Sequence, residues 1–334
     1  VSMINIKDKL DICCDFPAFF NMFFAGKSFA VLDIETTGLS PNFSAVILIG
    51  LVIFDGKEVR LEQFFAETPA EEKEIIALAN KSLEDVDYVV TYNGKLFDIP
   101  FLNKRSEKYG IKFRALCNLD LFMIMKHYSD LPKLLGSMSQ KSLEVFAGLS
   151  TDRSDKISGK ESVELYSQYQ TTGSKDMLSQ ILLHNSDDIK QLFQLVSVIK
   201  HADFSRAICH QGMPHEGGFI EKIDFKHSAL FIKGHMEDAI DYISFPSFEA
   251  PYSVNISKID FKYVIEIPAE TMTGSAFIDI KNMVSMDELG DNKFPGFDNN
   301  YLIIKENNRF NYTEIAIFAQ KFTSKILSEI QNKL

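Results

Sequence analysis

Two acidic residues inside an otherwise hydrophobic segment are the first feature that could do chemistry. Residues 29–39 read FAVLDIETTGL, a pattern typical of a buried β-strand that carries Asp33 and Glu35. Because side chains alternate between the faces of a strand, we expect both carboxylates on one face, about 7 Å apart. Burying two carboxylates is unfavourable unless a positive charge compensates, and divalent cations prefer such oxygen ligands. The pattern predicts a metal site, with solvated acids on an edge strand as the alternative.

A third acid follows a second buried strand. Residues 91–102 read TYNGKLFDIPFL, so Asp98 lies at the start of an expected helix, among apolar neighbours. A lone carboxylate is poorly placed there unless it faces a functional cavity. The alternative is an acid in the first helical turn that the helix dipole favours.

A histidine and an aspartate occur later, in a helix expected over residues 175–200. His184 and Asp188 are four residues apart and so share one face, which the flanking Ile181 and Leu192 mark as inward. Asp187 is also available, and the choice of Asp188 rests on this face. A solvated pair of side chains one turn apart is the alternative.

These residues need a sheet and helices to position them. Hydrophobic alternation predicts strands over residues 29–35, 45–54, 58–66 and 88–92. Amphipathic patterns predict a helix over 70–82, another that ends near 109, and mostly helical structure from 120 to 201. This order predicts an α/β fold in which a mixed sheet is flanked by helices.

Two further parts of the chain flank this region. Residues 1–28 mix apolar and charged positions, and we expect an N-terminal helical extension before the α/β domain at 29–205. Residues 219–334 contain short apolar or alternating segments and a final amphipathic helix, which predicts a smaller β-rich α+β domain. Its role is left open, including whether its C-terminal region forms a homodimer or binds a protein partner.

Composition excludes several classes of protein. The chain has 334 residues, of which 46% are hydrophobic and 24% charged, as in folded rather than disordered proteins. The sequence contains no run of about 18 apolar residues, the length that a membrane-spanning helix needs. Its start shows no targeting segment. The four cysteines have neither metal-binding nor disulfide-framework spacing. We therefore expect a soluble, cytoplasmic protein with no membrane partner.

Net charge argues against a broad nucleic-acid-binding face. Lys and Arg number 35 against 46 Asp and Glu, a formal charge of -11. Some of these acids are the candidate metal ligands, however, and residues 95–114 contain six Lys or Arg and only two acids. This segment is a candidate for contacts with a nucleic-acid backbone, with a solvated helix face as the alternative.

Together, the acids and the histidine resemble a known family. Their order is similar to that of the DEDD 3′–5′ exonucleases of the ribonuclease H-like superfamily. The segments LDIETTGL, TYNGK with FDIPFL, and HN followed by the last aspartate resemble the YprB-like branch. The resemblance covers about residues 29–201, and the residues that carry it are Asp33, Glu35, Asp98, His184 and Asp188.

The resemblance implies a ribonuclease H-like fold and metal-dependent 3′–5′ hydrolysis of phosphodiester bonds in DNA or RNA, at single-stranded 3′ ends. Two Mg²⁺ or Mn²⁺ ions would activate water and stabilise the leaving oxygen. Their ligands would be Asp33, Glu35, Asp98 and Asp188. His184 would orient or deprotonate the water, because histidine titrates near neutral pH. Substrate contacts are expected from Thr36, Asn93, Lys95, Lys104 and Arg105.

Two alternative functions share this fold, namely a ribonuclease H-like endonuclease and a non-catalytic module that binds nucleic acid or protein. One spacing also departs from the family pattern, because the His-type subgroup usually has five positions between the histidine and the last aspartate, and here the gap is four. Tyr92 or Tyr166 would contribute if His184 is not the base. Asp120, at the start of another expected helix, is a candidate supporting residue, with a plain helix cap as the favoured alternative.

Overall fold

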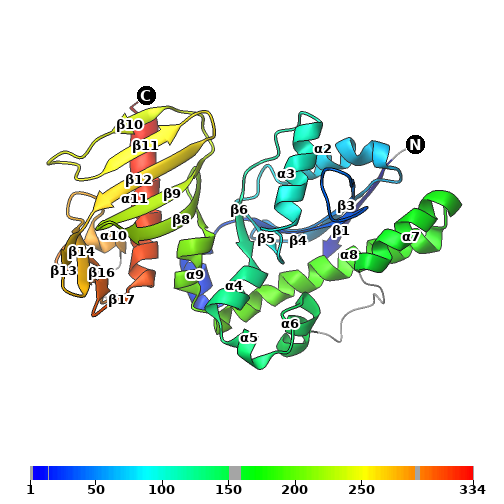
Figure 1. Ribbon diagram of the computed structural model, residues 1–334, viewed down its shortest axis with the longest axis horizontal. Coiled ribbons are helices and arrows are strands. Elements are labelled where there is room, and N and C mark those ends of the chain that lie inside the picture. The colour runs from blue at the N-terminus through cyan, green and yellow to red at the C-terminus, as the bar shows by residue number, and fades with distance from the viewer. Residues whose placement is uncertain (1–2, 14, 150–158, 290–293, 334) are drawn as a thin grey trace. The chain divides into compact units, whose positions relative to one another are not determined.

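The computed structural model describes residues 3–13, 15–149, 159–289 and 294–333. The chain divides into two compact units (Figure 1). The first consists of Val1–Asn21 and Ala25–Ala202, and the second of Met22–Phe24 and Asp203–Leu334. Among the described helices, none combines the length and apolar character that a membrane span requires.

The first unit is built on a sheet of six strands. They are β1 (Ile4–Leu10), β2 (Phe29–Thr36), β3 (Val46–Phe54), β4 (Val59–Phe65), β5 (Tyr88–Thr91) and β6 (Cys117–Asp120). Their spatial order is β1-β4-β3-β2-β5-β6. β2 runs parallel to β5, and β5 parallel to β6, whereas the other neighbouring strands are antiparallel. The predicted mixed α/β sheet is therefore confirmed.

Helices cover both faces of this sheet (Figure 1). α2 (Glu72–Ser82) and α3 (Asp98–Lys108) pack on one face, in a core that includes Leu32 and Ile34. α7 (Gly159–Thr172) and α8 (Lys175–Leu195) pack on the other face, against Ile47, Leu48 and Phe65. Because side chains alternate along β2, Asp33 and Glu35 point to the face that α8 covers.

The remaining helices of this unit are short. They are η1 (Pro69–Glu71), α4 (Leu121–Tyr128), α5 (Leu131–Leu134), α6 (Gln140–Ala147) and η3 (Val196–His201), where η marks a 3₁₀ helix. The long helix predicted over 175–200 thus ends as an α-helix at Leu195 and continues as a 3₁₀ segment.

The N-terminal segment corrects the prediction of a helical extension over 1–28. Among the described residues of this segment, helix is present only as α1 (Ala18–Phe24), whereas Ile4–Leu10 forms β1 and pairs antiparallel with β4. The segment reads INIKDKL, and Ile4 and Ile6 alternate with polar residues. Hydrogen bonding to the edge of a distant strand stabilises this segment, and a local pattern does not reveal such a partner.

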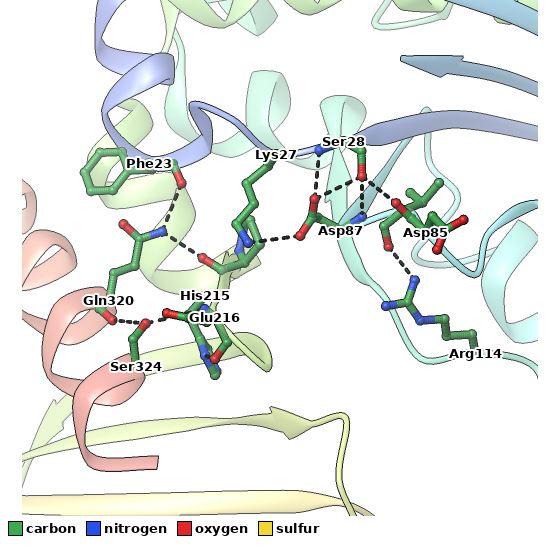
Figure 2. A network of polar contacts seen from close by, with 12 residues as sticks. Phe23, Lys27, Ser28, Asp85, Asp87, Arg114, His215, Glu216, Gln320 and Ser324 are labelled. Carbon is green, nitrogen blue, oxygen red and sulfur yellow. Dashed lines mark hydrogen bonds and ion pairs between the residues drawn. The ribbon is translucent and has the colours of Figure 1, made fainter. Parts of the chain in front are cut away.

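A polar cluster aligns the starts of β2 and β5 (Figure 2). The Asp87 carboxylate accepts hydrogen bonds from the Ser28 backbone N–H at 2.8 Å and from Lys27 Nζ at 3.0 Å. Arg114 Nη1 donates to the Leu83 carbonyl at 2.7 Å nearby. The contacts of Asp87 tie β2, which carries Asp33 and Glu35, to β5, which leads into the loop before Asp98.

The second unit contains two antiparallel sheets and confirms the predicted β-rich character of this region. One sheet has the order β10-β11-β12-β9-β8-β7, and the other is β13-β14-β16-β15 with β17 paired to β16. The strands are β7 (Met213–His215), β8 (Gly218–Lys226), β9 (Ala229–Met236), β10 (Tyr242–Ser244), β11 (Ser253–Ser257), β12 (Lys262–Pro268), β13 (Glu270–Met272), β14 (Ser275–Asp279), β15 (Phe297–Asp298), β16 (Tyr301–Glu306) and β17 (Arg309–Phe310).

The described part of this unit also contains the helices α9 (Phe204–Gln211), α10 (Met286–Leu289) and α11 (Tyr312–Gln331). The apolar face of α11 is buried, and Phe318 stacks on Phe322 at 5.4 Å between ring centroids. Gln320 Nε2 on the same helix donates to the carbonyls of Phe23 and Pro214 (Figure 2). The final helix is thus a core element of its unit.

Candidate active site

The pair of acids on β2 faces the histidine and aspartate of α8. His184 Nε2 lies 3.7 Å from Glu35 Oε1 and 3.6 Å from Asp188 Oδ2. The His184 and Glu35 residues are only 3% and 7% exposed. The four-residue spacing therefore places His184 and Asp188 one turn apart on α8, both directed at β2.

Asp98 joins this group from the other side of the sheet. It is the first residue of α3, directly after the loop that follows β5. Its Oδ1 accepts a hydrogen bond of 3.1 Å from the backbone N–H of Ile34, the residue between the two acids of β2. The three acids, which were predicted from two separate motifs, therefore meet at β2.

A pocket of about 380 Å³ opens at this point. Its lining residues are Asp33, Ile34, Glu35, Ser139, Gln140, Lys141, Gly159, His184 and Asp188. Asp188 lines the pocket, whereas Asp187 is buried away from it. Four of the five predicted residues thus line one pocket, and the fifth, Asp98, is hydrogen-bonded to the backbone of β2.

Burial makes the carboxylates of this site reluctant to ionise. Desolvation raises the pKa of Asp33 well above its ordinary value, and the charges of Asp98, Glu35 and Asp188 raise it further. The hydrogen bond from Asn185 acts in the opposite direction. Negative charge is therefore unfavourable here unless a cation balances it.

The pKa values of Glu35 and Asp98 are raised for the same reason. Burial raises the pKa of Glu35 to about 7, although the neighbouring His184 lowers it. Burial also raises the pKa of Asp98 to about 7, against its backbone hydrogen bonds, which favour the charged form. Both groups titrate in the physiological range, as carboxyls at functional sites often do.

The chemistry of these donors fits a divalent cation, because several carboxylate oxygens face one pocket and repel one another. Within the described ranges, no three His, Cys, Asp or Glu side chains lie close enough to form a ready-made ion cage. Ion binding would therefore have to draw the carboxylates of Asp33, Glu35, Asp98 and Asp188 towards one another.

Asn185 contacts the centre of the site, although the sequence motifs did not mark it as a functional residue. Asn185 Nδ2 donates to Asp33 Oδ2 at 2.9 Å. Gln140 and Lys141 of α6 also line the pocket and had no local signal, because α6 is brought there only by packing against α8. The position of Asn185, directly after His184, was the one available clue.

Two predicted substrate contacts lie in the loops beside the pocket. Thr36 is buried, and its Oγ1 donates to the Gly38 carbonyl at 2.8 Å, within the loop after β2. Asn93 has a positive φ of 64°, which confirms the tight turn after β5. Both residues shape loops, and direct contact with a substrate stays a prediction.

Asp120 organises the loop after β5. Its carboxylate accepts hydrogen bonds from the backbone N–H groups of Asn93 at 2.9 Å and Lys95 at 3.0 Å. It also accepts from the Met123 N–H at 3.2 Å and so caps α4. The favoured helix-cap interpretation is therefore confirmed, with an added role in the loop that precedes Asp98.

The basic residues of α3 differ in their surroundings. Lys104 is exposed and forms an ion pair of 3.4 Å with Glu107. Arg105 is buried, and its Nη2 lies 2.5 Å from Glu72 Oε2 of α2. This ion pair holds α2 against α3, and contact of Arg105 with a substrate stays a prediction.

The two tyrosines considered as alternative bases are engaged elsewhere. The hydroxyl of Tyr92 donates to the Met138 carbonyl, and that of Tyr166 donates to the Ala66 carbonyl at 3.0 Å. Burial raises the pKa of both phenols above the ordinary value. Neither group is positioned to take a proton in the pocket.

Comparison with known proteins identifies the family. The family model described as the RNase_H superfamily matches residues 30–200, which is just over half of the chain. The chain therefore belongs to the RNase_H superfamily. The match coincides with the unit that contains the pocket.

Curated relatives match only a part of the chain and a small part of their own length. The DNA polymerase III PolC-type of Mycoplasma pneumoniae is 34% identical over 105 residues, which are 25% of this chain and 7% of that protein. The DNA polymerase of Pyrococcus horikoshii is 34% identical over 94 residues, 25% of this chain and 8% of that protein. The chain spans less than a tenth of the length of these relatives.

Solved structures with similar chain traces include a DNA polymerase and an exonuclease. The family B DNA polymerase of Pyrobaculum calidifontis has a TM-score of 0.43 at 14% identity, and the likeness covers 88% of this chain and 46% of that one. Exonuclease I of E. coli in complex with a dT13 oligonucleotide has a TM-score of 0.35 at 12% identity, with 62% and 55% coverage.

Proposed function

We propose that this protein is a metal-dependent 3′–5′ exonuclease that hydrolyses phosphodiester bonds of DNA or RNA with two divalent ions, Mg²⁺ or Mn²⁺. The observation that carries the proposal is the meeting of Asp33, Glu35, His184 and Asp188 in one pocket. Asp98 is tied to the backbone between the first two acids. Membership in the RNase_H superfamily supports the same class of activity.

The arrangement of the acids supports the DEDD group and its YprB-like branch. Glu35 lies on the same strand as Asp33, two residues away, whereas ribonuclease H itself takes its glutamate from a helix. The Tyr-Asn-Gly turn before Asp98 and the Asn that follows His184 are the features that point to the YprB-like branch.

Asp33, Glu35, Asp98 and Asp188 would hold the ions. When bound, the ions would supply Lewis-acid activation of a water molecule and compensation of the charge on the leaving 3′ oxygen. The carboxylates would contribute the ligand oxygens, and because the pKa values of Glu35 and Asp98 are raised to about 7, ion binding would displace protons near neutral pH.

His184 is the group that would orient the attacking water and take its proton. Its Nε2 faces Glu35 and Asp188 at 3.6 to 3.7 Å, so a water between them would be within reach of the imidazole. Lys141, exposed on α6 at the pocket, would contact a phosphate of the substrate. Asn93, Lys95 and Lys104 stay candidate contacts on the neighbouring loop and helix.

The experiment that tests this proposal uses single-stranded DNA and RNA labelled at the 5′ end. The wild type with Mn²⁺ or Mg²⁺ should produce a ladder of products that shorten one nucleotide at a time, and a chelator should abolish it. Because the matched polymerases act on DNA by name, DNA is the first substrate to test. Asp33→Ala serves as the inactive control.

A circular single strand distinguishes the alternative functions. An exonuclease leaves it intact, whereas an endonuclease on the same fold cuts it. If neither linear nor circular strands are shortened by the wild type, or if Asp33→Ala behaves like the wild type, the proposal is wrong and a non-catalytic binding module is favoured.

A further inference from the structure

Three residues form a row across the sheet on the face that α8 covers. The strand register pairs Asp33 of β2 with Gly50 of β3, and Gly50 with Gln63 of β4. Asn185 of α8 is fully buried and lies across this row. Its Nδ2 donates to Asp33 Oδ2 at 2.9 Å, and its Oδ1 accepts from Gln63 Nε2 at 2.9 Å. One amide thus connects both ends of the row.

The orientation of the two amides follows from a backbone carbonyl. Gln63 Nε2 also contacts the Leu182 carbonyl oxygen at 2.9 Å, and a carbonyl oxygen can only accept. The Gln63 atom at this point must therefore be the nitrogen. Its second N–H then faces the oxygen of Asn185, so the Asn185 nitrogen is the atom that faces Asp33. These contacts therefore hold an N–H donor of Asn185 against the Asp33 carboxylate.

Gly50 provides the room for this arrangement. A Cβ atom at residue 50 would lie 2.1 Å from Asn185 Oδ1 and 2.8 Å from its Cγ. Real Cβ atoms do not approach other atoms so closely, and the Asn185 side chain would have to move. The glycine is needed because the amide crosses directly over the strand.

We propose that Asn185 is a positioning residue for Asp33, oriented by Gln63 and given room by Gly50, and that it sets the affinity of the site for divalent cations. The amide occupies one oxygen of the Asp33 carboxylate and fixes the rotation of the group. The other oxygen is thereby directed for ion binding. This inference rests on the proposed function, because it assigns Asn185 a task in that same site.

The test compares Mn²⁺ binding, measured by isothermal titration calorimetry, with the Mn²⁺ dependence of cleavage. Asn185→Leu keeps a side chain of similar size and removes the donor. We expect its dissociation constant for Mn²⁺ to rise about 10- to 100-fold, the usual effect of removing a hydrogen-bond partner of a metal ligand. The Mn²⁺ concentration for half-maximal cleavage should rise by the same factor, and saturating Mn²⁺ should restore most of the rate.

Gly50→Ala tests the same inference while residue 185 stays an asparagine. The added methyl group should displace Asn185 and weaken Mn²⁺ binding in the same direction. Gln191→Leu is the matched control, because it removes another buried amide from α8 that does not line the pocket. A purely structural role of Asn185 would lower stability in both α8 variants without changing the affinity for Mn²⁺.

The outcomes separate this inference from the proposed function. If the wild type neither binds Mn²⁺ nor cleaves, the proposed function is wrong, and the inference falls with it. If the wild type does both, and Asn185→Leu and Gly50→Ala bind Mn²⁺ with the wild-type affinity, only the inference is overturned. Should Asn185→Leu fail to fold, Gly50→Ala and Gln63→Leu decide by the same criterion.

Discussion

At the scale of single residues, the acids of the pocket oppose folding when no cation is bound. Glu35 and Asp98 have pKa values of about 7 in the folded chain, well above their ordinary values. The folded state therefore holds protons that the unfolded state has lost between about pH 4 and pH 7. The stability that these groups contribute is fully present below their unfolded pKa and is lost as the pH rises through 7. Such a cost is common where function requires buried charge.

Asp98→Asn tests this cost directly. The amide can still accept the hydrogen bond from the Ile34 N–H but carries no charge. We expect the variant to be more stable than the wild type at pH 8 in a chelator by about 4 kcal/mol, because the pKa of Asp98 is raised by about three units and each unit corresponds to about 1.4 kcal/mol. The two proteins should converge towards pH 4. Urea unfolding across this range measures the effect.

Asp130→Asn is the control, since this aspartate is exposed and does not line the pocket. A wild type that becomes more stable between pH 5 and pH 8 in the chelator would contradict the assignment of the raised pKa values.

The identity of the base gives a second prediction at this scale. His184→Gln should lower kcat about 10²- to 10⁴-fold, the usual contribution of a general base. Tyr92→Phe and Tyr166→Phe should change kcat only slightly, because both hydroxyls donate to backbone carbonyls. Single-turnover kinetics at saturating Mn²⁺ measures the chemical step. A larger loss in either tyrosine variant than in His184→Gln would reassign the base.

At the scale of the elements, local patterns predicted β2, the turn at Asn93 and the shared face of His184 and Asp188. The strand and the shared helix face depend on a period of two or four residues that can be counted along the sequence, and the turn depends on the Asn-Gly pair. The strand β1 and the row through Gly50 and Gln63 could not be predicted in this way. Both depend on which strands lie side by side and in which register, and these are set by contacts between distant segments.

Lys104 and Arg105 on α3 test the difference between an exposed side chain and one that joins two elements. Arg105→Ala leaves the buried Glu72 carboxylate without its cationic partner and should destabilise the protein by about 3–5 kcal/mol. Lys104→Ala removes an exposed side chain and should change stability by less than about 0.5 kcal/mol. Thermal unfolding separates them. If instead Arg105→Ala folds with wild-type stability and raises KM, Arg105 is a substrate contact after all.

At the scale of the whole molecule, the proposed chemistry resides in the first unit. The family match ends at residue 200, and the main segment of the second unit begins at Asp203. The formal charge of -11 opposes tight binding of a polyanion, and bound divalent ions would reverse the sign of the field at the pocket. Acidic composition and a nucleic-acid substrate are therefore compatible.

Substrate affinity should accordingly depend on metal and on salt. Fluorescence anisotropy with a labelled single-stranded oligonucleotide and the inactive His184→Gln variant should show weak binding in a chelator and tighter binding with Mn²⁺. Added salt should weaken the remaining affinity, as expected for contacts with phosphates. Tight, metal-free binding to long duplex DNA would point to a broad basic face that the charge distribution does not predict.

The number of Mn²⁺ ions bound per chain is the most direct test of the proposed site for two divalent ions. An equilibrium titration followed by the electron paramagnetic resonance signal of free Mn²⁺ counts them without any assumption about the substrate. We expect two ions in the wild type and fewer in Asp33→Asn, since Asp33 lies at the centre of the acidic group. A wild type that binds no Mn²⁺, or an Asp33→Asn variant that binds as many ions as the wild type, would contradict it.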